Sequence, residues 1–271
     1  MSSQDDFQLF TTLRYDRQLL GSDENTQINA NKPSPFHLLT YHRDRMLHAA
    51  LNFGWEAACI KLGGSVGLEH LGDILAANFD IENQISPLRI KVVIDSSGDI
   101  TIQSSHTPPK SLCNILPSQL PPPTKDAVPP LGSPSTQGAY EVLVDTAFTT
   151  PSEFTKFKTT KREMYDDARR RVAIASMTDE KEVLLINIKE EVMEGSLTNV
   201  IFWRKGRWIT PPLQSGGQAG TTRRWLLEKG MVEEDTALKA DLVDGEVCWL
   251  SNGLRGLIPG RINLKSSSGQ T

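Results

Sequence analysis

The stretch Glu194–Arg223, EGSLTNVIFWRKGRWITPPLQSGGQAGTTR, decides the fold that we expect for this chain. Two short runs rich in β-branched and aromatic residues, 199–203 and 207–210, flank a turn at Lys205-Gly206. Pro211-Pro212 ends the second run, because proline cannot donate a hydrogen bond to a neighbouring strand. This pattern predicts a β-hairpin.

The glycine-rich segment 214–220 follows the hairpin and leads into an amphipathic helix that we expect to end at Gly230. Backbone N–H groups at a helix N-terminus, beside the hydroxyl side chains of Thr221 and Thr222, favour the binding of a phosphate. A Gly-Gly-x-x-Gly segment is more often only a flexible loop with a threonine N-cap. The segment is therefore a hypothesis for a phosphate site that needs support from the rest of the chain.

Composition narrows the functional classes. The 271 residues suffice for two modest domains, and 38% hydrophobic and 23% charged residues are typical of a soluble globular protein. A formal net charge of -4 gives no electrostatic basis for nucleic-acid binding. The three cysteines lack the spacing of metal ligands, so we expect no metal site. With neither a secretory leader nor an apolar run of about 18 residues, we expect a cytoplasmic protein that does not bind membranes.

The first part of the chain predicts an α+β domain. The expected elements are a strand over 7–15, an amphipathic helix from His37 that carries Met46, Ala49, Ala50 and Phe53 on one face, a helix near 66–77, and a hairpin over 89–95 and 98–102. Residues 104–138 are rich in proline, serine, threonine and glycine, which favours a linker or surface excursion. The domain boundary belongs in this segment.

The second part of the chain predicts mainly strands. We expect strands over 140–145, 183–188 and 246–252, and a helix that begins within 159–169 and continues through Ala175. The order Glu-Gly-Ser-x-x-Asn, hairpin, Thr-Pro-Pro-Leu and Gly-x-Thr-Arg at a helix start resembles the signature of the class IV, or fold type IV, pyridoxal-phosphate (PLP) enzymes. This resemblance implies an α+β, two-domain fold. Its parts would be a smaller N-terminal α/β domain over 1–118, a linker over 119–138, a C-terminal PLP-binding pseudo-barrel domain over 139–265, and a disordered tail over 266–271.

The resemblance also assigns roles to particular residues. His42-x-x-Arg45 is similar to the family's His-x-x-Arg-Leu, which places Arg45 at the cofactor phosphate. Lys158 would form the Schiff base with the cofactor and act as general base and acid, and Glu194 would keep the pyridine nitrogen protonated. The remaining phosphate contacts would come from Gly220, Thr221, Thr222, Ser251 and Asn252. Without the resemblance, the arginine and the lysine are more simply read as surface charges.

Two neighbouring lysines compete with Lys158. We prefer Lys158 because Lys156 would point to the opposite face of a strand, and Lys161 falls inside the Lys-x-x-x-Arg pattern. Two positions depart from the family. The chain has Thr11-Thr12 where members often have Glu-Thr, and Gln218 where many have an apolar residue packed on the cofactor ring.

The segments around Lys158, Arg45 and Ser251 look most like those of fungal-type aminodeoxychorismate lyases. That resemblance implies β-elimination from 4-amino-4-deoxychorismate, which gives 4-aminobenzoate and pyruvate for folate synthesis. Two alternatives are a class IV aminotransferase, of branched-chain, D-amino-acid or amine type, and a non-catalytic paralogue. The family also implies a small-molecule amine substrate and a homodimer.

Overall fold

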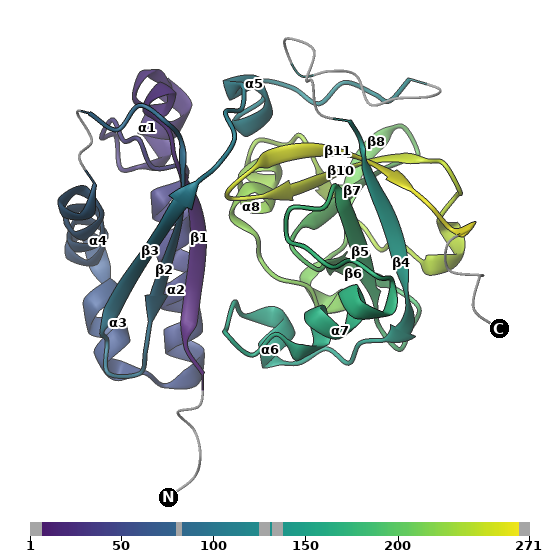
Figure 1. Ribbon diagram of the computed structural model, residues 1–271, viewed down its shortest axis with the longest axis horizontal. Helices are drawn as coiled ribbons and strands as arrows, with labels where there is room; N and C mark the ends of the chain where they lie inside the picture. Colours follow the sequence, from purple (N-terminus) through teal and green to yellow (C-terminus); the bar gives the residue numbers. More distant parts are fainter. Residues whose placement is uncertain (1–6, 80–82, 125–130, 132–137, 266–271) are drawn as a thin grey trace, which may run out of the picture. The chain divides into compact units, whose positions relative to one another are not determined.

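The computed structural model describes residues 7–79, 83–124, 131 and 138–265. The chain divides into two compact units (Figure 1). The first contains the part of the chain up to Leu112 together with Phe157–Lys161, and the second contains Cys113–Lys156 and the chain from Arg162 onward. The domain limits expected from the sequence stay a prediction. Much of the expected linker and the tail 266–271 lie outside the described residues.

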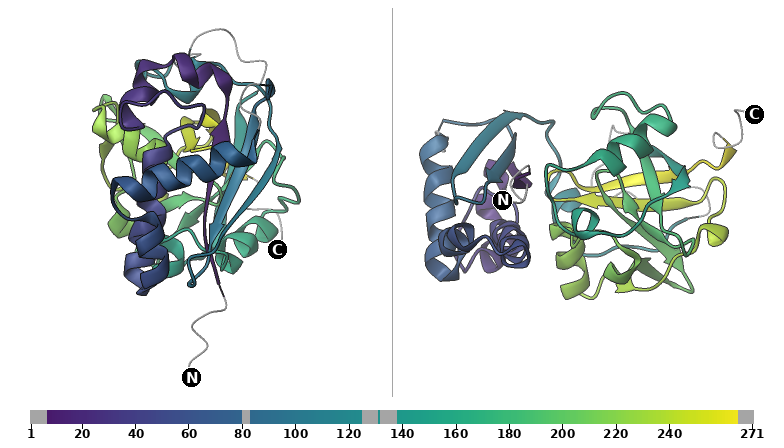
Figure 2. Two further views of the ribbon diagram at one scale, coloured as in Figure 1. Left: turned by 90° about the vertical axis from the view of Figure 1, so that its left-hand side faces the viewer. Right: turned by 90° about the horizontal axis from the view of Figure 1, so that it is seen from below.

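The first unit is built on a three-stranded antiparallel sheet in the order β1 (Leu9–Tyr15), β2 (Leu88–Ile94), β3 (Ile100–His106). The strand over 7–15 and the hairpin expected from the sequence are thus present. The helical elements of this unit are η1 (Arg17–Gly21), α1 (Asp23–Ile28), α2 (Leu39–Phe53), α3 (Glu56–Leu62) and α4 (Gly64–Asn78). The longer helices gather on one face of the sheet (Figure 2).

Helix α2 is the expected amphipathic helix, but its ends differ from the expectation. It begins after Leu38, which has a φ of 50°, and ends at Gly54, which has a φ of 68°. Both residues adopt the left-handed conformation, which a helix cannot continue through. The chain after Gly54 therefore starts a new helix, α3, which the sequence pattern did not predict.

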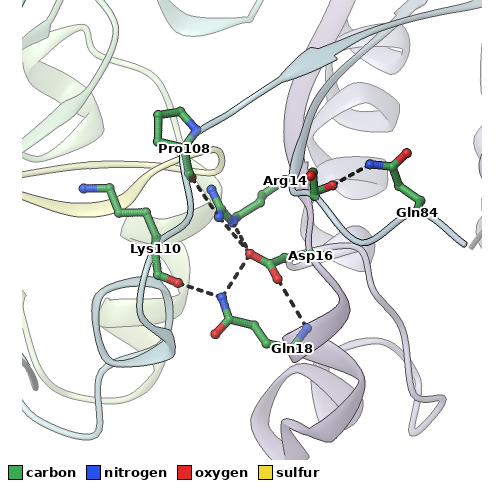
Figure 3. Close-up of polar contacts among 7 residues, drawn as sticks. Arg14, Asp16, Gln18, Gln84, Pro108 and Lys110 are labelled. Carbon is green, nitrogen blue, oxygen red and sulfur yellow. Dashed lines mark hydrogen bonds and ion pairs between the residues drawn. The ribbon is translucent and has the colours of Figure 1, made fainter.

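A buried ion pair fixes the chain that leaves β3. Arg14 and Asp16 lie 2.7 Å apart, and Arg14 Nη2 also donates to the carbonyl oxygen of Pro108 at 3.0 Å (Figure 3). The Gln18 side chain donates to Asp16 and, at 2.7 Å, to the carbonyl oxygen of Lys110. The residues beyond β3 are thereby attached to the end of β1.

Segment Phe157–Lys161 pairs with the start of β1. Phe10 N donates to the Lys158 carbonyl oxygen at 3.1 Å, and Thr160 N donates to the Gln8 carbonyl oxygen at 2.9 Å. The expectation of a strand running into Lys158 is wrong for the preceding residues, because Glu153–Lys156 form the short helix α6. Ser152 and Thr155 exchange hydrogen bonds of 2.9 and 3.0 Å at the start of this helix. The argument that separated Lys156 from Lys158 by strand faces is therefore wrong. Two residues that are two positions apart along a strand would in any case lie on the same face.

The second unit is built on an eight-stranded sheet in the order β6-β5-β4-β11-β10-β7-β8-β9. The strands are β4 (Tyr140–Phe148), β5 (Lys181–Ile186), β6 (Val192–Gly195), β7 (Asn199–Arg204), β8 (Arg207–Thr210), β9 (Glu233–Glu234), β10 (Val247–Asn252) and β11 (Gly256–Ile262). The helical elements are α5 (Leu112–Ile115), α6 (Glu153–Lys156), α7 (Glu163–Arg171), η2 (Leu213–Ser215), α8 (Thr221–Glu228) and η3 (Lys239–Asp241). Among the described residues, the helices are all too short or too polar to span a bilayer.

One predicted helix of this part differs in extent from its expectation, and another helix was not predicted. Helix α7 ends at Arg171 rather than continuing through Ala175, because Ala173 has a φ of 55°. The unpredicted helix is α5, which lies inside the proline-rich segment 104–138. The hairpin β7–β8 and helix α8 agree with the sequence, and Lys205 and Gly206 form the turn with φ values of 50° and 81°.

The sheet of the second unit is buried on both faces. Along β4, Val142 and Val144 belong to one hydrophobic cluster and Leu143 to another. The second cluster lies under α7 and includes Tyr165 and Met193. Side chains alternate between the two faces of a strand, so each strand can contribute to both clusters. The sheet curls around the cluster that contains Val142 and Val144 (Figure 1).

The turn between β6 and β7 is held by a buried carboxylate. Glu182 is 2% exposed and accepts hydrogen bonds from the backbone N–H groups of Val183, Ser196 and Leu197 and from the hydroxyls of Ser196 and Thr198, at 2.6 to 3.1 Å. Gly195 fits here because an added Cβ would lie 2.8 Å from Glu182 and 2.5 Å from Thr198 Oγ1. The turn sets the spacing between Glu194 and Asn199.

In the first unit, a buried polar contact joins β1 to α2. Arg45 Nη2 donates to Thr11 Oγ1 at 2.5 Å, which directs the Thr11 hydroxyl proton to His42 Nδ1 at 2.6 Å. His42 is fully buried, and its pKa lies well below the usual 6.5, first because of burial and then because of Arg45, His37 and Lys158. The imidazole is therefore neutral, with Nδ1 as the acceptor.

We predict that Glu182→Gln lowers the free energy of unfolding by about 2–3 kcal/mol or more, because the amide NH2 would face N–H and O–H groups that now donate to the carboxylate. Urea unfolding followed by circular dichroism measures this change. The control is Glu180→Gln on the exposed surface, which should stay within about 0.5 kcal/mol of the wild type. Equal stability of the two variants would contradict the role of Glu182.

The neutral state of His42 predicts a dependence of stability on pH. Below the ordinary histidine pKa of about 6.5, the unfolded chain binds a proton that the folded chain does not. The stability contributed by this site should therefore fall by up to about 1.4 kcal/mol per pH unit as the pH decreases below 6.5. Urea unfolding of the wild type and of His42→Asn between pH 5 and 8 isolates the contribution of this site. Parallel pH profiles for the two proteins would rule it out.

Candidate active site

The predicted site residues fall into two groups, one in each unit. Arg45 and Lys158 belong to the first unit, and the other predicted residues belong to the second.

In the first unit, Lys158 lies beside β1. Its Nζ is 4.9 Å from the centre of the Phe10 ring, and the side chain is half-buried, whereas Lys156 is exposed. Lys161 is also half-buried and lies 5.5 Å from the Phe7 ring. Arg45 is half-buried and is oriented by Thr11. The charges of Lys158 and Arg45 both act on the pKa of His42, which places these two cations near one histidine.

In the second unit, Glu194 lies in β6, one residue before its end, and its carboxylate is buried, with the residue 4% exposed. Its Oε1 accepts a hydrogen bond from the Tyr165 hydroxyl at 2.6 Å. Its Oε2 accepts from the backbone N–H of Gln218 at 3.0 Å and from Asn199 Nδ2 at 3.3 Å. Several donors on one carboxylate favour its ionised form. This geometry suits a residue that must present a negative charge to a protonated ring nitrogen.

Tyr165 and Gln218 are contacts of Glu194 that the sequence did not assign. Tyr165 comes from α7, and Gln218 Nε2 donates to its hydroxyl at 3.0 Å. The pKa of Tyr165 is raised well above 10, first by burial and then by the negative charge of Glu194. The only signal in the sequence was the departure at Gln218, which is polar where an apolar residue was expected.

Asn199 explains the spacing of the Glu-Gly-Ser-x-x-Asn motif. Its Nδ2 donates to Glu194 and, at 2.9 Å, to the carbonyl oxygen of Gln218. Its Oδ1 lies so close to Gly220 that a Cβ added at Gly220 would be 1.9 Å away. The asparagine therefore connects the carboxylate to the glycine-rich loop, and only glycine fits at position 220.

The N-terminus of α8 has the features of an anion site. Gly220 is its N-cap and supplies no capping side chain. The Thr222 hydroxyl is buried and has no hydrogen-bond partner among the described residues, and the same holds for the Ser251 hydroxyl on β10, against which α8 packs. Buried hydroxyls without partners are costly unless a ligand satisfies them. Both residues were predicted to contact a phosphate, and this observation fits that group.

The neighbouring residues have structural contacts instead. Asn252 donates to the Leu197 carbonyl oxygen at 3.2 Å and accepts from the backbone N–H groups of Leu254 and Arg255. Its amide thus holds the β10–β11 turn. Arg223, the last residue of Gly-x-Thr-Arg, donates to the Pro211 carbonyl oxygen at 2.9 Å and pairs with Glu234.

The chain is similar to known proteins along most of its length. The family model described as amino-transferase class IV matches residues 21–262. Aminodeoxychorismate lyase of Saccharomyces cerevisiae is 34% identical over 141 residues, which are 46% of this chain and 38% of that protein. A putative aminodeoxychorismate lyase of Schizosaccharomyces pombe is 39% identical over 106 residues, or 38% of this chain and 46% of that protein. The chain thus matches less than half the length of these relatives.

A third relative and two solved structures extend the match. Aminodeoxychorismate lyase of Bacillus subtilis is 26% identical over 87% of this chain and 77% of its own length. A putative amino-acid aminotransferase from Mesorhizobium loti has a TM-score of 0.65 at 22% identity, over 95% of this chain and all of that one. A hypothetical aminotransferase from Mycobacterium tuberculosis in its PLP-bound form has a TM-score of 0.62 at 15% identity, over 97% and 82% of the two chains.

These comparisons confirm the fold and the family expected from the sequence. Pyridoxal 5'-phosphate is the cofactor of that family, as the resemblance implied. The family model matches residues 21–262 of this chain, and the solved structures share its fold. This chain therefore belongs to the class IV aminotransferase family.

Proposed function

We propose that this protein is a PLP-dependent 4-amino-4-deoxychorismate lyase, which forms 4-aminobenzoate and pyruvate. The observation that carries the cofactor assignment is the buried Glu194 carboxylate, held by Tyr165, Gln218 and Asn199. The choice of a lyase is supported by the similarity to the yeast, fission yeast and Bacillus proteins of that name.

The residues that would hold the cofactor phosphate carry complementary donors. We assign this role to Arg45, to the first backbone N–H groups of α8 after Gly220, and to the hydroxyls of Thr222 and Ser251. A guanidinium can donate two hydrogen bonds to phosphate oxygens, and a helix N-terminus favours a negative charge. Thr221 contributes its backbone at the same helix start. Asn252 would act by shaping the turn next to Ser251.

When bound, the cofactor supplies a protonated pyridine ring that accepts the electrons left at the substrate α-carbon. Glu194 would stay ionised and hold the proton on the ring nitrogen. Lys158 would bind the cofactor aldehyde carbon, remove the proton from the α-carbon as general base, and return a proton to the leaving group as general acid. Lys158 and Glu194 are therefore the two catalytic residues that we propose.

The lyase reaction requires no second substrate. Loss of the α-proton and of the enolpyruvate group at the β-carbon leaves an aromatic ring, and the enolpyruvate becomes pyruvate by gaining that proton. Aromatisation makes the elimination strongly favourable. If the proton instead moves to the cofactor, the same residues perform transamination. A class IV aminotransferase is the alternative, and a Thermotoga maritima relative, 29% identical over 49% of this chain, is named a probable branched-chain-amino-acid aminotransferase.

We further propose a homodimer in the cytoplasm that acts on a small-molecule amine, without nucleic-acid or membrane partners. We also propose that residues 1–118 and 139–265 form two functional domains. Sedimentation of the purified protein tests the oligomeric state.

We predict that protein loaded with PLP converts enzymatically generated aminodeoxychorismate into equal amounts of 4-aminobenzoate and pyruvate. Lys158→Ala should abolish both this turnover and the absorbance band of the lysine-bound cofactor, because alanine has no amine to bind the aldehyde carbon. The control is Lys156→Ala, an exposed lysine two residues away. Products from Lys158→Ala would show that the lysine is wrongly chosen. A cofactor band without products would favour the aminotransferase.

The two buried hydroxyls predict a phosphate-specific loss of affinity. Thr222→Val and Ser251→Ala each remove a donor without changing the shape of the side chain greatly. Each should weaken PLP binding by roughly tenfold or more, as expected for a hydrogen bond to a charged group. Pyridoxal, which has no phosphate, serves as the control ligand and should bind the variants and the wild type alike. If PLP binds all three proteins equally, neither hydroxyl contacts the phosphate.

A further inference from the structure

Gln218 is the clearest departure of this chain from its family, and the structure shows what its side chain does. It is 7% exposed and its Nε2 donates to the Tyr165 hydroxyl at 3.0 Å. Its backbone N–H donates to Glu194 Oε2 at 3.0 Å. One residue therefore contacts Glu194 directly through its backbone and indirectly through Tyr165.

The hydrogen bond from Gln218 sets the direction of the Tyr165 hydroxyl. A phenol has one proton, and an oxygen that accepts from Gln218 turns this proton toward another acceptor. Glu194 Oε1 lies 2.6 Å from the hydroxyl oxygen, nearer than the Thr155 carbonyl oxygen at 3.1 Å. The length is typical of a hydrogen bond to a charged acceptor. Tyr165 thus donates to the carboxylate.

Arg162 holds the ring of Tyr165 from its face. The guanidinium carbon lies 4.3 Å from the ring centre, and Arg162 Nη2 donates to the Ser196 carbonyl oxygen at 2.7 Å. Ser196 belongs to the turn that Glu182 binds. The phenol is therefore fixed relative to the turn that begins at Glu194.

A buried carboxylate beside a protonated ring nitrogen has two possible states. Either the proton stays on nitrogen and the pair is ionic, or it moves to the carboxylate and the pair is neutral. Hydrogen bonds donated to the carboxylate stabilise the ionic state, since they interact more strongly with a charged acceptor. Removing one of them shifts the pair toward the neutral state.

We propose that Tyr165 and Gln218 are positioning residues that keep the Glu194 carboxylate ionised, and thereby keep the proton on the cofactor ring nitrogen. This inference rests on the proposed function, in which Glu194 contacts that nitrogen. It assigns the unexpected polar residue at position 218 to the electronic control of the cofactor. The ring contact expected of an apolar residue at this position is not its role.

The experiment measures the protonation of the ring nitrogen directly. Protein is loaded with PLP labelled with 15N in the ring, and the 15N chemical shift is recorded for the wild type, Tyr165→Phe and Gln218→Leu. The wild type should show the shift of a protonated pyridine. Tyr165→Phe should move toward the neutral value, and Gln218→Leu should move less in the same direction, because its backbone N–H still donates to Glu194.

A matched control separates this effect from general destabilisation. Tyr140→Phe removes a hydroxyl from another buried tyrosine, which belongs to the other hydrophobic cluster of the same unit. Its 15N shift should equal that of the wild type. In steady-state kinetics, Tyr165→Phe should lower kcat by roughly tenfold or more, while the dissociation constant of PLP stays within about threefold.

The outcomes distinguish the inference from the function on which it rests. If wild-type protein binds PLP with a protonated ring and both variants keep the same 15N shift, the inference is wrong and the proposed function stands. If the wild type does not bind PLP, the proposed function itself fails. A shift in Tyr165→Phe that Tyr140→Phe shares would also overturn the inference.

Discussion

The second unit depends on one buried negative charge. Glu182 lies at the start of β5, and its carboxylate accepts hydrogen bonds from each residue of the turn between β6 and β7. A buried carboxylate is tolerable only with such donors, and the donors in turn need the carboxylate. The hydrogen bonds to Glu182 therefore favour one conformation of the turn. Glu194 and Asn199, at its two ends, inherit that conformation.

From this turn, contacts continue to the proposed phosphate site. Asn199 binds the loop at Gln218 and lies against Gly220, and Gly220 begins α8. A second glycine, Gly217, allows the loop to approach β6, since a Cβ there would lie 2.7 Å from the Met193 carbonyl oxygen. The carboxylate of Glu194 and the N-terminus of α8 are therefore held at a fixed separation. A cofactor with a basic ring at one end and a phosphate at the other needs such a separation.

The sequence predicted those elements whose signals are local. The β7–β8 hairpin, helix α8 and the strand β1 follow from periodicity and turn residues, and the resemblance supplied the family and the order of the site residues. Helix α6 was missed because its four residues lie in a run of lysine, threonine and phenylalanine that also suits a strand. The contact of Tyr165 with Glu194 joins residues 29 positions apart, and its contact with Gln218 joins residues 53 apart, so no periodic pattern encodes them. The roles of the site residues remain predictions.

The departure at Thr11 also gains a physical meaning. A carboxylate at this position would offset the charge of Arg45, whereas the neutral Thr11 hydroxyl orients the guanidinium by accepting a hydrogen bond. His42 completes the arrangement as a neutral acceptor. The first unit thereby presents an oriented cation without a buried counter-charge from β1.

The path of the chain has a consequence for how such a protein can evolve. Segment Phe157–Lys161 belongs to the first unit although the residues on both sides of it belong to the second, so the chain passes between the units at three places. No single break in the chain separates the two units. A fragment that ends at Leu112 would lack the segment that carries Lys158. Exchange of one unit for another by gene fusion would remove or misplace the proposed nucleophile. The path of the chain therefore disfavours recombination that exchanges one unit alone.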